Sequence, residues 1–222
     1  RMATEVLMSA LADAMAELGP DAREHAPRPA IEQSIIRANQ AIYHAGRSDP
    51  KYRGMGTTLA LAVFFDNQVT LAHVGDSRIY RVRAGKLRLL TRDDSLLRDQ
   101  VELGVISAAE ASQSHNRSLV TRALGIAPGV SPHVVQDAAL PGDLYLLCSD
   151  GLNDLVEDAD IELIMSSLDV NLPLAAQHLV QAAKDNGGYD NVSVILAKVR
   201  APFPANARGG WLRRLFAWFA RR

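Results

Sequence analysis

Four short acidic motifs contain the residues whose types and spacing could do chemistry. They are Gly75-Asp76-Ser77-Arg78, Ser149-Asp150-Gly151-Leu152, Asn153-Asp154 and Asp190-Asn191-Val192-Ser193. Each motif stands where an apolar run ends or begins, which predicts a position at the end of a strand. Carboxylates brought to strand ends from distant parts of a chain form sites for hard divalent cations.

Carboxylates that lie this close together need a positive neighbour. Two unit charges 4 Å apart repel by about 4 kcal/mol at an effective dielectric constant near 20. Arg78, Arg122 or a metal ion could provide the compensation. Because the donors are all oxygen, with no suitable His or Cys beside them, the set favours Mg²⁺ or Mn²⁺ over zinc. A single Asp is more often a turn or cap residue, but that interpretation weakens when the motifs are taken together.

The periodicity of the apolar residues predicts the elements that would position these motifs. Two amphipathic helices come first, and from Leu59 to Phe65 the period changes to two with both faces apolar, which predicts a buried strand. Short turns then predict an antiparallel meander. The later elements are strands over 69–74, 79–82 and 86–90, a polar helical region from Asp94 to about Ser112, strands over 130–136, 144–149 and 192–199, and helices over 158–168 and 173–184. This order indicates an α+β layering in which helices cover antiparallel sheet.

Composition excludes several classes of protein. The 222 residues, 48% hydrophobic and 22% charged, suffice for one well-cored domain, and the net charge of -1 argues against nucleic-acid binding. Cys148 is the only cysteine, so neither an internal disulfide nor a thiolate metal cage is expected. No stretch reaches the roughly 18 apolar residues of a membrane-spanning helix. We therefore expect a reducing, cytoplasmic setting.

Five ordered motifs resemble the metal-dependent protein phosphatases of the PP2C class, in the form found in bacterial serine/threonine phosphatases. They are Gly54-Met55-Gly56-Thr57-Thr58, the run from Ala72 to Arg78, Thr121-Arg122-Ala123-Leu124-Gly125, the run from Cys148 to Leu152, and the run from Tyr189 to Ser193. The resemblance covers residues 1–199. It implies an αββα sandwich of two antiparallel sheets flanked by helices, with a two-metal centre at one end.

The resemblance also implies roles for individual residues. Asp150 and Asp190 would bind one catalytic Mn²⁺ or Mg²⁺, and Asp76 and Asp154 would join Asp150 around a third, weaker ion. The supporting residues would be Gly151, which permits close approach of the backbone, Asn191, which supports the Asp190 loop, and Arg78, which we expect to orient Asp76 through a charge-assisted hydrogen bond. The region from Gly104 to Leu124 resembles the mobile flap over the site, where His115 could contact phosphate, although a solvated loop histidine is an alternative. We expect His73 to be a packed strand residue.

The implied reaction is hydrolysis of phosphoserine or phosphothreonine on proteins by a metal-activated water, without a covalent enzyme intermediate. The implied partners are phosphoprotein substrates and a bacterial Ser/Thr kinase that the phosphatase opposes, with type VI secretion control as one setting. The family's opening segment, which supplies the aspartate bridging the two catalytic metals and two core strands, has no counterpart here and is expected before Arg1. We therefore expect this chain alone to be inactive or poorly folded, with exposed sheet edges. The alternative is a pseudophosphatase, a binding module that lacks complete metal ligands.

The C-terminal tail forms a separate feature. Residues 200–210 are predicted to be a linker, and the spacing of residues 211–222 predicts a short helix with aromatic residues on one face and arginines largely opposite. This pattern is typical of an interfacial helix, which predicts peripheral contact with a membrane. Docking of the tail on the domain itself or on a partner protein is an equally open interpretation.

Overall fold

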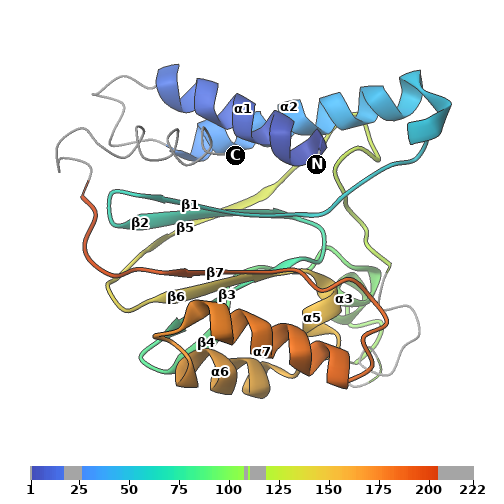
Figure 1. Cartoon of the computed structure of the whole chain (residues 1–222). Helices are drawn as coiled ribbons and strands as arrows, with labels where there is room; N and C mark the ends of the chain where they lie inside the picture. The colour runs from blue at the N-terminus through green and yellow to red at the C-terminus, as the bar shows by residue number, and fades with distance from the viewer. Residues whose placement is uncertain (1, 18–26, 108–109, 111–118, 205–222) are drawn as a thin grey trace.

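The computed structural model of the chain describes residues 2–17, 27–107, 110 and 119–204. Helices lie outside and two sheets lie between them (Figure 1). The helical elements are α1 (Met2–Glu17), α2 (Pro27–Ser48), the short η2 (Pro50–Tyr52), α3 (Leu96–Glu102), α5 (Asp150–Asn153), α6 (Asp158–Ser167) and α7 (Leu172–Asp185). The strands are β1 (Leu59–Phe65), β2 (Gln68–Val74), β3 (Arg78–Arg83), β4 (Lys86–Leu89), β5 (His133–Ala138), β6 (Leu144–Cys148) and β7 (Val194–Lys198).

The strands form two antiparallel sheets, one with the order β1-β2-β5 and one with the order β4-β3-β6-β7. Helices α1 and α2 cover the outer face of the first sheet, and α6 and α7 cover the outer face of the second (Figure 1). The expected αββα sandwich is therefore confirmed.

Apolar side chains fill the three spaces between these four layers. Beneath α1 and α2 the buried residues include Leu7, Ile31, Ile35, Ala72 and Val74. Between the sheets they include Val69, Leu71, Ile79 and Tyr145. Beneath α6 and α7 they include Tyr80, Leu146, Ile161, Met165 and Leu179. The two sheets are thus covered on both faces, which holds the strand ends at fixed positions relative to one another.

Strand β1 divides its side chains between two of these cores, as its two-residue period predicted. Leu59, Leu61 and Val63 pack toward the helices, whereas Ala60, Ala62 and Phe64 pack between the sheets. The prediction that β1 is a buried strand was wrong, because all seven of its residues are only half-buried. Within the described ranges β1 pairs with β2 alone and so forms a sheet edge.

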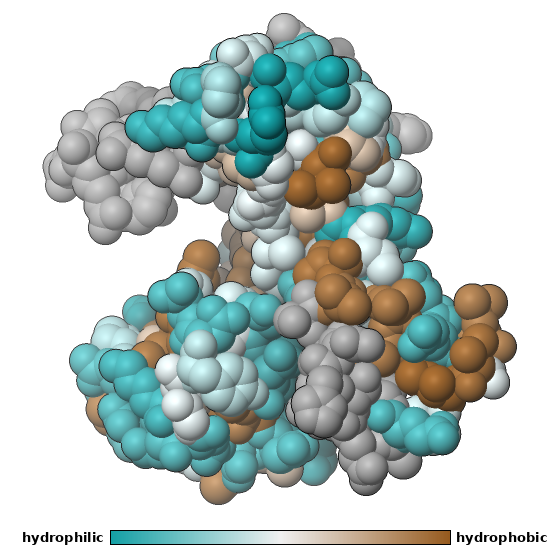
Figure 2. Space-filling model, turned by 90° about the vertical axis from the view of Figure 1, so that its right-hand side faces the viewer, coloured by the Kyte–Doolittle hydropathy of each residue, from teal (hydrophilic) through white to brown (hydrophobic). Residues whose placement is uncertain are grey.

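Strand β7 is the corresponding edge of the second sheet. Its Ile195 side chain is 64% exposed. A groove of about 400 Å³ runs from α1 along β1 to Ile195 and is lined mainly by apolar side chains. Figure 2 shows the molecule hollowed between its upper and lower parts. The exposed sheet edges and apolar surface that we expected are therefore present.

The predicted meander was wrong at one connection. Strands β1 and β2 pair, and β3 and β4 pair, but β2 and β3 belong to different sheets. Gly75 follows β2 with a φ of +101°, a backbone conformation that residues with a side chain rarely adopt. The chain leaves the first sheet at this turn and enters the second at Arg78. The alternation of apolar residues does not distinguish a turn that returns to its own sheet from one that changes sheets.

The predicted helical region from Asp94 to Ser112 is shorter in the described residues. Helix α3 spans Leu96–Glu102, and the side chain of Ser95 caps it by accepting a hydrogen bond from the Arg98 N–H at 3.3 Å. Gly104, with a φ of +70°, follows its C-terminus. Asp94 therefore precedes the helix, and this position leaves its carboxylate free to contact other segments.

Candidate metal centre

Three of the four predicted metal ligands interact with one another electrostatically. Asp76 lies in the turn between β2 and β3, Asp150 begins α5 directly after β6, and Asp154 is the C-terminal cap of α5. The Asp76 side chain is buried, and its ionisation responds to the charges of both Asp150 and Asp154. The end of β6 and the turn after β2 thus place these carboxylates within range of one another's charge, while their role as joint metal ligands stays a prediction.

The electrostatics of Asp76 would favour a bound cation. Burial raises the pKa of Asp76 to about 6, and repulsion by Asp150, then by Asp93 and Asp154, acts in the same direction. A hydrogen bond to its own backbone lowers the pKa but does not offset these effects. At neutral pH the cluster therefore carries negative charge at a cost that a bound divalent cation would remove.

Ser149 attaches the loop that carries Asp190 to the end of β6. The backbone N–H of Ser149 donates to the Ser193 carbonyl at 3.1 Å. Its hydroxyl donates to the Asn191 carbonyl at 3.1 Å and accepts from the Ser193 N–H at 3.0 Å. Asp190 is exposed, and its Oδ1 accepts from the Asn191 N–H at 2.6 Å. These bonds hold Asp190 near the start of α5, while its role as a joint ligand with Asp150 stays a prediction.

Gly151 permits this arrangement because it has no side chain. A Cβ atom at this position would lie 2.5 Å from the carbonyl oxygen of Asn191 and 3.0 Å from its carbonyl carbon. Real non-bonded contacts are not this short, so any other residue would displace the Asp190 loop. Gly151 thus allows two backbone segments to meet, while the predicted approach of its backbone to a ligand stays a prediction.

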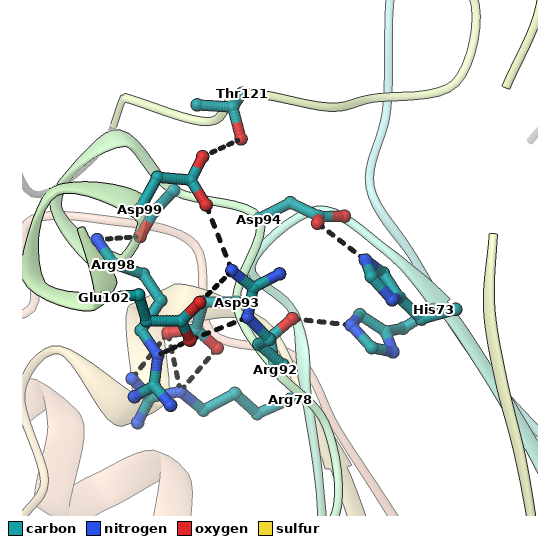
Figure 3. Close-up of polar contacts among 11 residues, drawn as sticks. His73, Arg78, Arg92, Asp93, Asp94, Arg98, Asp99, Glu102 and Thr121 are labelled. Carbon is teal, nitrogen blue, oxygen red and sulfur yellow. Dashed lines mark hydrogen bonds and ion pairs between the residues drawn. The ribbon is translucent and has the colours of Figure 1, made fainter. Parts of the chain in front are cut away.

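The expected contact between Arg78 and Asp76 was wrong. The Arg78 guanidinium binds Asp93, with Nε to Oδ1 at 3.0 Å and Nη2 to Oδ2 at 2.7 Å, and it also donates to the Tyr80 hydroxyl at 3.0 Å. Figure 3 shows this ion pair. Arg78 and Asp93 face each other across the space between the start of β3 and the end of β4, a contact that sequence neighbourhood with Asp76 does not reveal.

Arg122, the other arginine considered for charge compensation, binds a different aspartate. Its Nη1 donates to Asp94 Oδ1 at 3.1 Å and lies 2.8 Å from His133 Nε2, which is itself 3.0 Å from the same carboxylate oxygen. His73, Asp94 and His133 have potential metal-ligand atoms within 4.8 Å of one another. Among the described residues, theirs is the group of three or more His, Cys, Asp or Glu side chains that meets this distance. His73 is a packed strand residue, as expected: it is 5% exposed and stacks on His133.

Sequence reasoning missed Asp93, Asp94 and Ser149. The signal for the two aspartates is the doublet in Thr91-Arg92-Asp93-Asp94-Ser95, which stands between a strand and the serine cap of α3. Ser149 was visible only as the first residue of an acidic motif. Its role depends on Asn191 and Ser193, which lie more than 40 residues further along the chain.

Several predictions fall outside the described residues. His115, the central part of the predicted flap and the 211–222 tail are among them, as is most of the 200–210 linker. Among the helices that the structure does describe, none combines the length and the apolar character needed to cross a bilayer.

The donor chemistry of the site fits Mn²⁺ or Mg²⁺. The predicted ligands are carboxylates, which are the preferred donors of hard divalent ions. Burial of Asp76 beside carboxylate neighbours supplies the field that would attract such an ion. Asp76, Asp150 and Asp154 would hold one ion, and Asp150 and Asp190 another.

Comparison with known proteins agrees with this geometry. The protein phosphatase 2C family matches residues 1–183. The serine/threonine protein phosphatase PstP of Mycobacterium tuberculosis is 39% identical over 170 residues, which cover 76% of this chain and 32% of PstP. A crystal structure of PstP from this organism aligns with a TM-score of 0.75 at 36% identity, over 89% of this chain and 83% of that one. A second PstP structure, of the catalytic domain with two manganese ions, aligns with a TM-score of 0.70 at 35% identity, over 88% and 81%.

The chain spans about a third of the length of PstP. Its match to the family nevertheless extends over most of its own residues and includes the turn that carries Asp76 and the helix α5 with Asp150 and Asp154 at its two ends. The chain belongs to the protein phosphatase 2C family.

Proposed function

We propose that this chain forms the metal-binding catalytic part of a protein serine/threonine phosphatase. The observation that carries the proposal is the burial of Asp76 within range of the charges of Asp150 and Asp154, together with the hydrogen bonds by which Ser149 holds the Asp190 loop beside the start of α5. PstP, which this chain resembles, is named a serine/threonine protein phosphatase, and its catalytic domain has been solved with two manganese ions. Phosphoserine and phosphothreonine of proteins are therefore the proposed substrates.

Some residues of the chain would bind the metal ions, and others would support the loops that carry those ligands. Asp150 and Asp190 would bind one Mn²⁺ or Mg²⁺, and Asp76, Asp154 and Asp150 a further one. Gly151 lets the Asp190 loop approach α5, and Asn191 contributes the carbonyl that Ser149 binds. When bound, the ions would supply activation of a water molecule and neutralisation of phosphoryl charge.

Mn²⁺ binding tests the site without depending on turnover. Isothermal titration of the purified chain with Mn²⁺ at pH 7.5 should show binding that is weakened at least tenfold in Asp150→Asn. Asp13→Asn, which removes an exposed carboxylate from α1 in the opposite outer layer, is the matched control and should bind like the original chain. Equal binding by Asp150→Asn would remove the proposed site.

A hydrolysis assay distinguishes a phosphatase from a pseudophosphatase. When the chain is joined to the family's opening segment, release of phosphate from phosphothreonine peptides should require Mn²⁺ or Mg²⁺ and stop on chelation, whereas the chain alone is expected to be inactive. A pseudophosphatase, which would only bind phosphoproteins, would retain phosphopeptide without metal-dependent release. The burial of Asp76 near Asp150 and Asp154 supports the enzyme over the binding module, because a module without chemistry has no need for a buried carboxylate that its neighbours repel.

The biological setting is part of the proposal. A Ser/Thr kinase and its targets are the proposed partners, with control of type VI secretion as one setting, and the single buried thiol of Cys148 is consistent with a reducing cytoplasm. Contact of the 211–222 tail with a membrane or a protein would be tested by liposome co-sedimentation with and without residues 209–222. Equal partitioning of both forms would exclude the membrane.

A further inference from the structure

Asp94 holds the turn that precedes Asp76 from two directions. Its backbone N–H donates to the Gly75 carbonyl at 3.0 Å, and its Oδ2 accepts from the Gly75 N–H at 3.0 Å. The Asp94 side chain is 2% exposed, so these bonds lie away from competing water. Gly75 has the positive φ that redirects the chain toward the second sheet, and Asp76 is the next residue. The conformation of the Asp76 turn is therefore set by Asp94.

The remaining acceptors of Asp94 bind the C-terminal part of the predicted flap. Its carbonyl accepts from the Thr121 N–H at 2.8 Å, and its Oδ1 accepts from Arg122 Nη1 at 3.1 Å. The two oxygens of one carboxylate thus serve two segments, with Oδ2 on the Asp76 turn and Oδ1 on Arg122. Asp94 itself lies in the loop between β4 and α3 (Figure 3).

The neighbouring histidines support this arrangement and do not form a metal site of their own. His73 Nε2 lies 2.6 Å from the Arg92 carbonyl, which can only accept, so this nitrogen carries the proton. The rings of His73 and His133 stack with an interplanar angle of 15°, and lone pairs in the planes of parallel rings do not converge on one ion. The Arg122 guanidinium already lies within 3.1 Å of both Asp94 Oδ1 and His133 Nε2.

We infer that Asp94 is a positioning residue of the metal centre, which fixes Asp76 through Gly75 and links it to the segment around Arg122. The inference rests on the proposed function, because it assigns Asp94 a task only if Asp76 binds metal. Asp94 itself does not bind the ion. Loss of such a supporting contact commonly weakens metal binding by 10- to 100-fold.

Two substitutions distinguish the role of Oδ2, which binds the Gly75 N–H, from that of Oδ1, which binds Arg122. Asp94→Asn can keep an oxygen on the Gly75 N–H while its amide faces His133, and the half-exposed Arg122 side chain moves into solvent. Asp94→Ala removes both of these hydrogen bonds. Titration of the chain with Mn²⁺ should show affinity within about threefold of the original for Asp94→Asn, and affinity at least tenfold weaker for Asp94→Ala. Amide exchange at Gly75 should accelerate at least tenfold in Asp94→Ala and change little in Asp94→Asn.

The Asp76→Asn background shows whether the effect passes through Asp76. There Asp94→Ala should weaken Mn²⁺ binding less than twofold further, whereas an equal tenfold loss would mean a general disruption and overturn the inference. Original affinity in folded Asp94→Ala would also overturn it, as would Zn²⁺ binding that is lost in His133→Ala. If circular dichroism shows Asp94→Ala to be unfolded, Asp94→Ser, whose hydroxyl is too short to reach Gly75, takes its place. A parent chain that binds no Mn²⁺ at all removes the proposed function, and the inference with it.

Discussion

Replacing Gly151 by alanine places a methyl group against the loop that carries Asp190. The added Cβ would lie 2.5 Å from the Asn191 carbonyl oxygen, whereas carbon and oxygen atoms in proteins stay about 3.3 Å apart or more. The Asn191 carbonyl must therefore move by roughly 0.8 Å. Metal sites tolerate deviations of about 0.2 Å in ligand distance. We expect Mn²⁺ affinity to fall by at least tenfold.

The stability of the same variant should change little. Overpacking costs about 1–3 kcal/mol, and replacing a helical glycine by alanine returns about 0.5–1 kcal/mol. The net loss of about 1 kcal/mol corresponds to a Tm lower by about 2–4 °C. Isothermal titration with Mn²⁺ and thermal unfolding followed by circular dichroism measure both quantities.

Gly129→Ala is the control for this experiment, because no heavy atom lies within 4 Å of its added Cβ and its φ is not positive. It should match the original chain in Mn²⁺ affinity and Tm. Gly151→Ala with unchanged Mn²⁺ affinity would refute the reasoning that the Asp190 loop must approach α5 for metal to bind.

The other predictions concern ionisation and the core. Burial and carboxylate neighbours raise the pKa of Asp76 from 3.8 to about 6. At pH 7 the charged form of Asp76 therefore lowers the stability of the metal-free fold by about 3 kcal/mol. Asp76→Asn should raise the Tm of the metal-free protein at pH 7 and weaken Mn²⁺ binding. Mn²⁺ affinity in titrations should rise with pH through about 6 and then level off, and a flat profile would contradict the assignment. Asp143→Ala should cost about 3 kcal/mol in urea unfolding at pH 7, because it leaves Arg83 without its buried partner. Although burial raises the Asp143 pKa, hydrogen bonds from Arg83 and the Leu140 N–H lower it overall, so this contribution is complete above the unfolded pKa of about 3.8 and should disappear as the pH falls below it. Gly125→Ala, at a φ of +86° and with Ile42 Cγ2 2.3 Å from the added Cβ, should lower Tm by several degrees.

The layers and the acidic motifs could be predicted from sequence because both depend on local patterns. The two-residue period of β1 assigned its side chains to the correct cores, and the motif around Asp150 marked the end of β6. The change of sheet at Gly75 could not be predicted, because a short turn with a glycine is compatible with either path. The edge position of β1 was equally hidden, since two apolar faces describe a central strand as well as an edge strand of a sandwich.

The ion-pair partners of the arginines could not be predicted from the sequence either, and these partners affect the charge at the proposed metal site. Sequence proximity suggested that Arg78 would neutralise Asp76, yet Arg78 binds Asp93, and Arg122 binds Asp94. Each arginine considered for compensation is thus held by an aspartate of the loop after β4.

This pairing explains why the Asp76 carboxylate keeps a raised pKa although arginines lie nearby. An arginine placed among the metal ligands would have removed the repulsion, and it would also have competed with the ion for the same oxygens. With Arg78 and Arg122 held elsewhere, the attraction of the aspartate cluster remains available to a divalent cation. The Asp93-Asp94 doublet therefore contributes to the proposed site in two ways. Its carboxylates bind Arg78 and Arg122 away from Asp76, and Asp94 holds Gly75, the residue that precedes Asp76 in the turn.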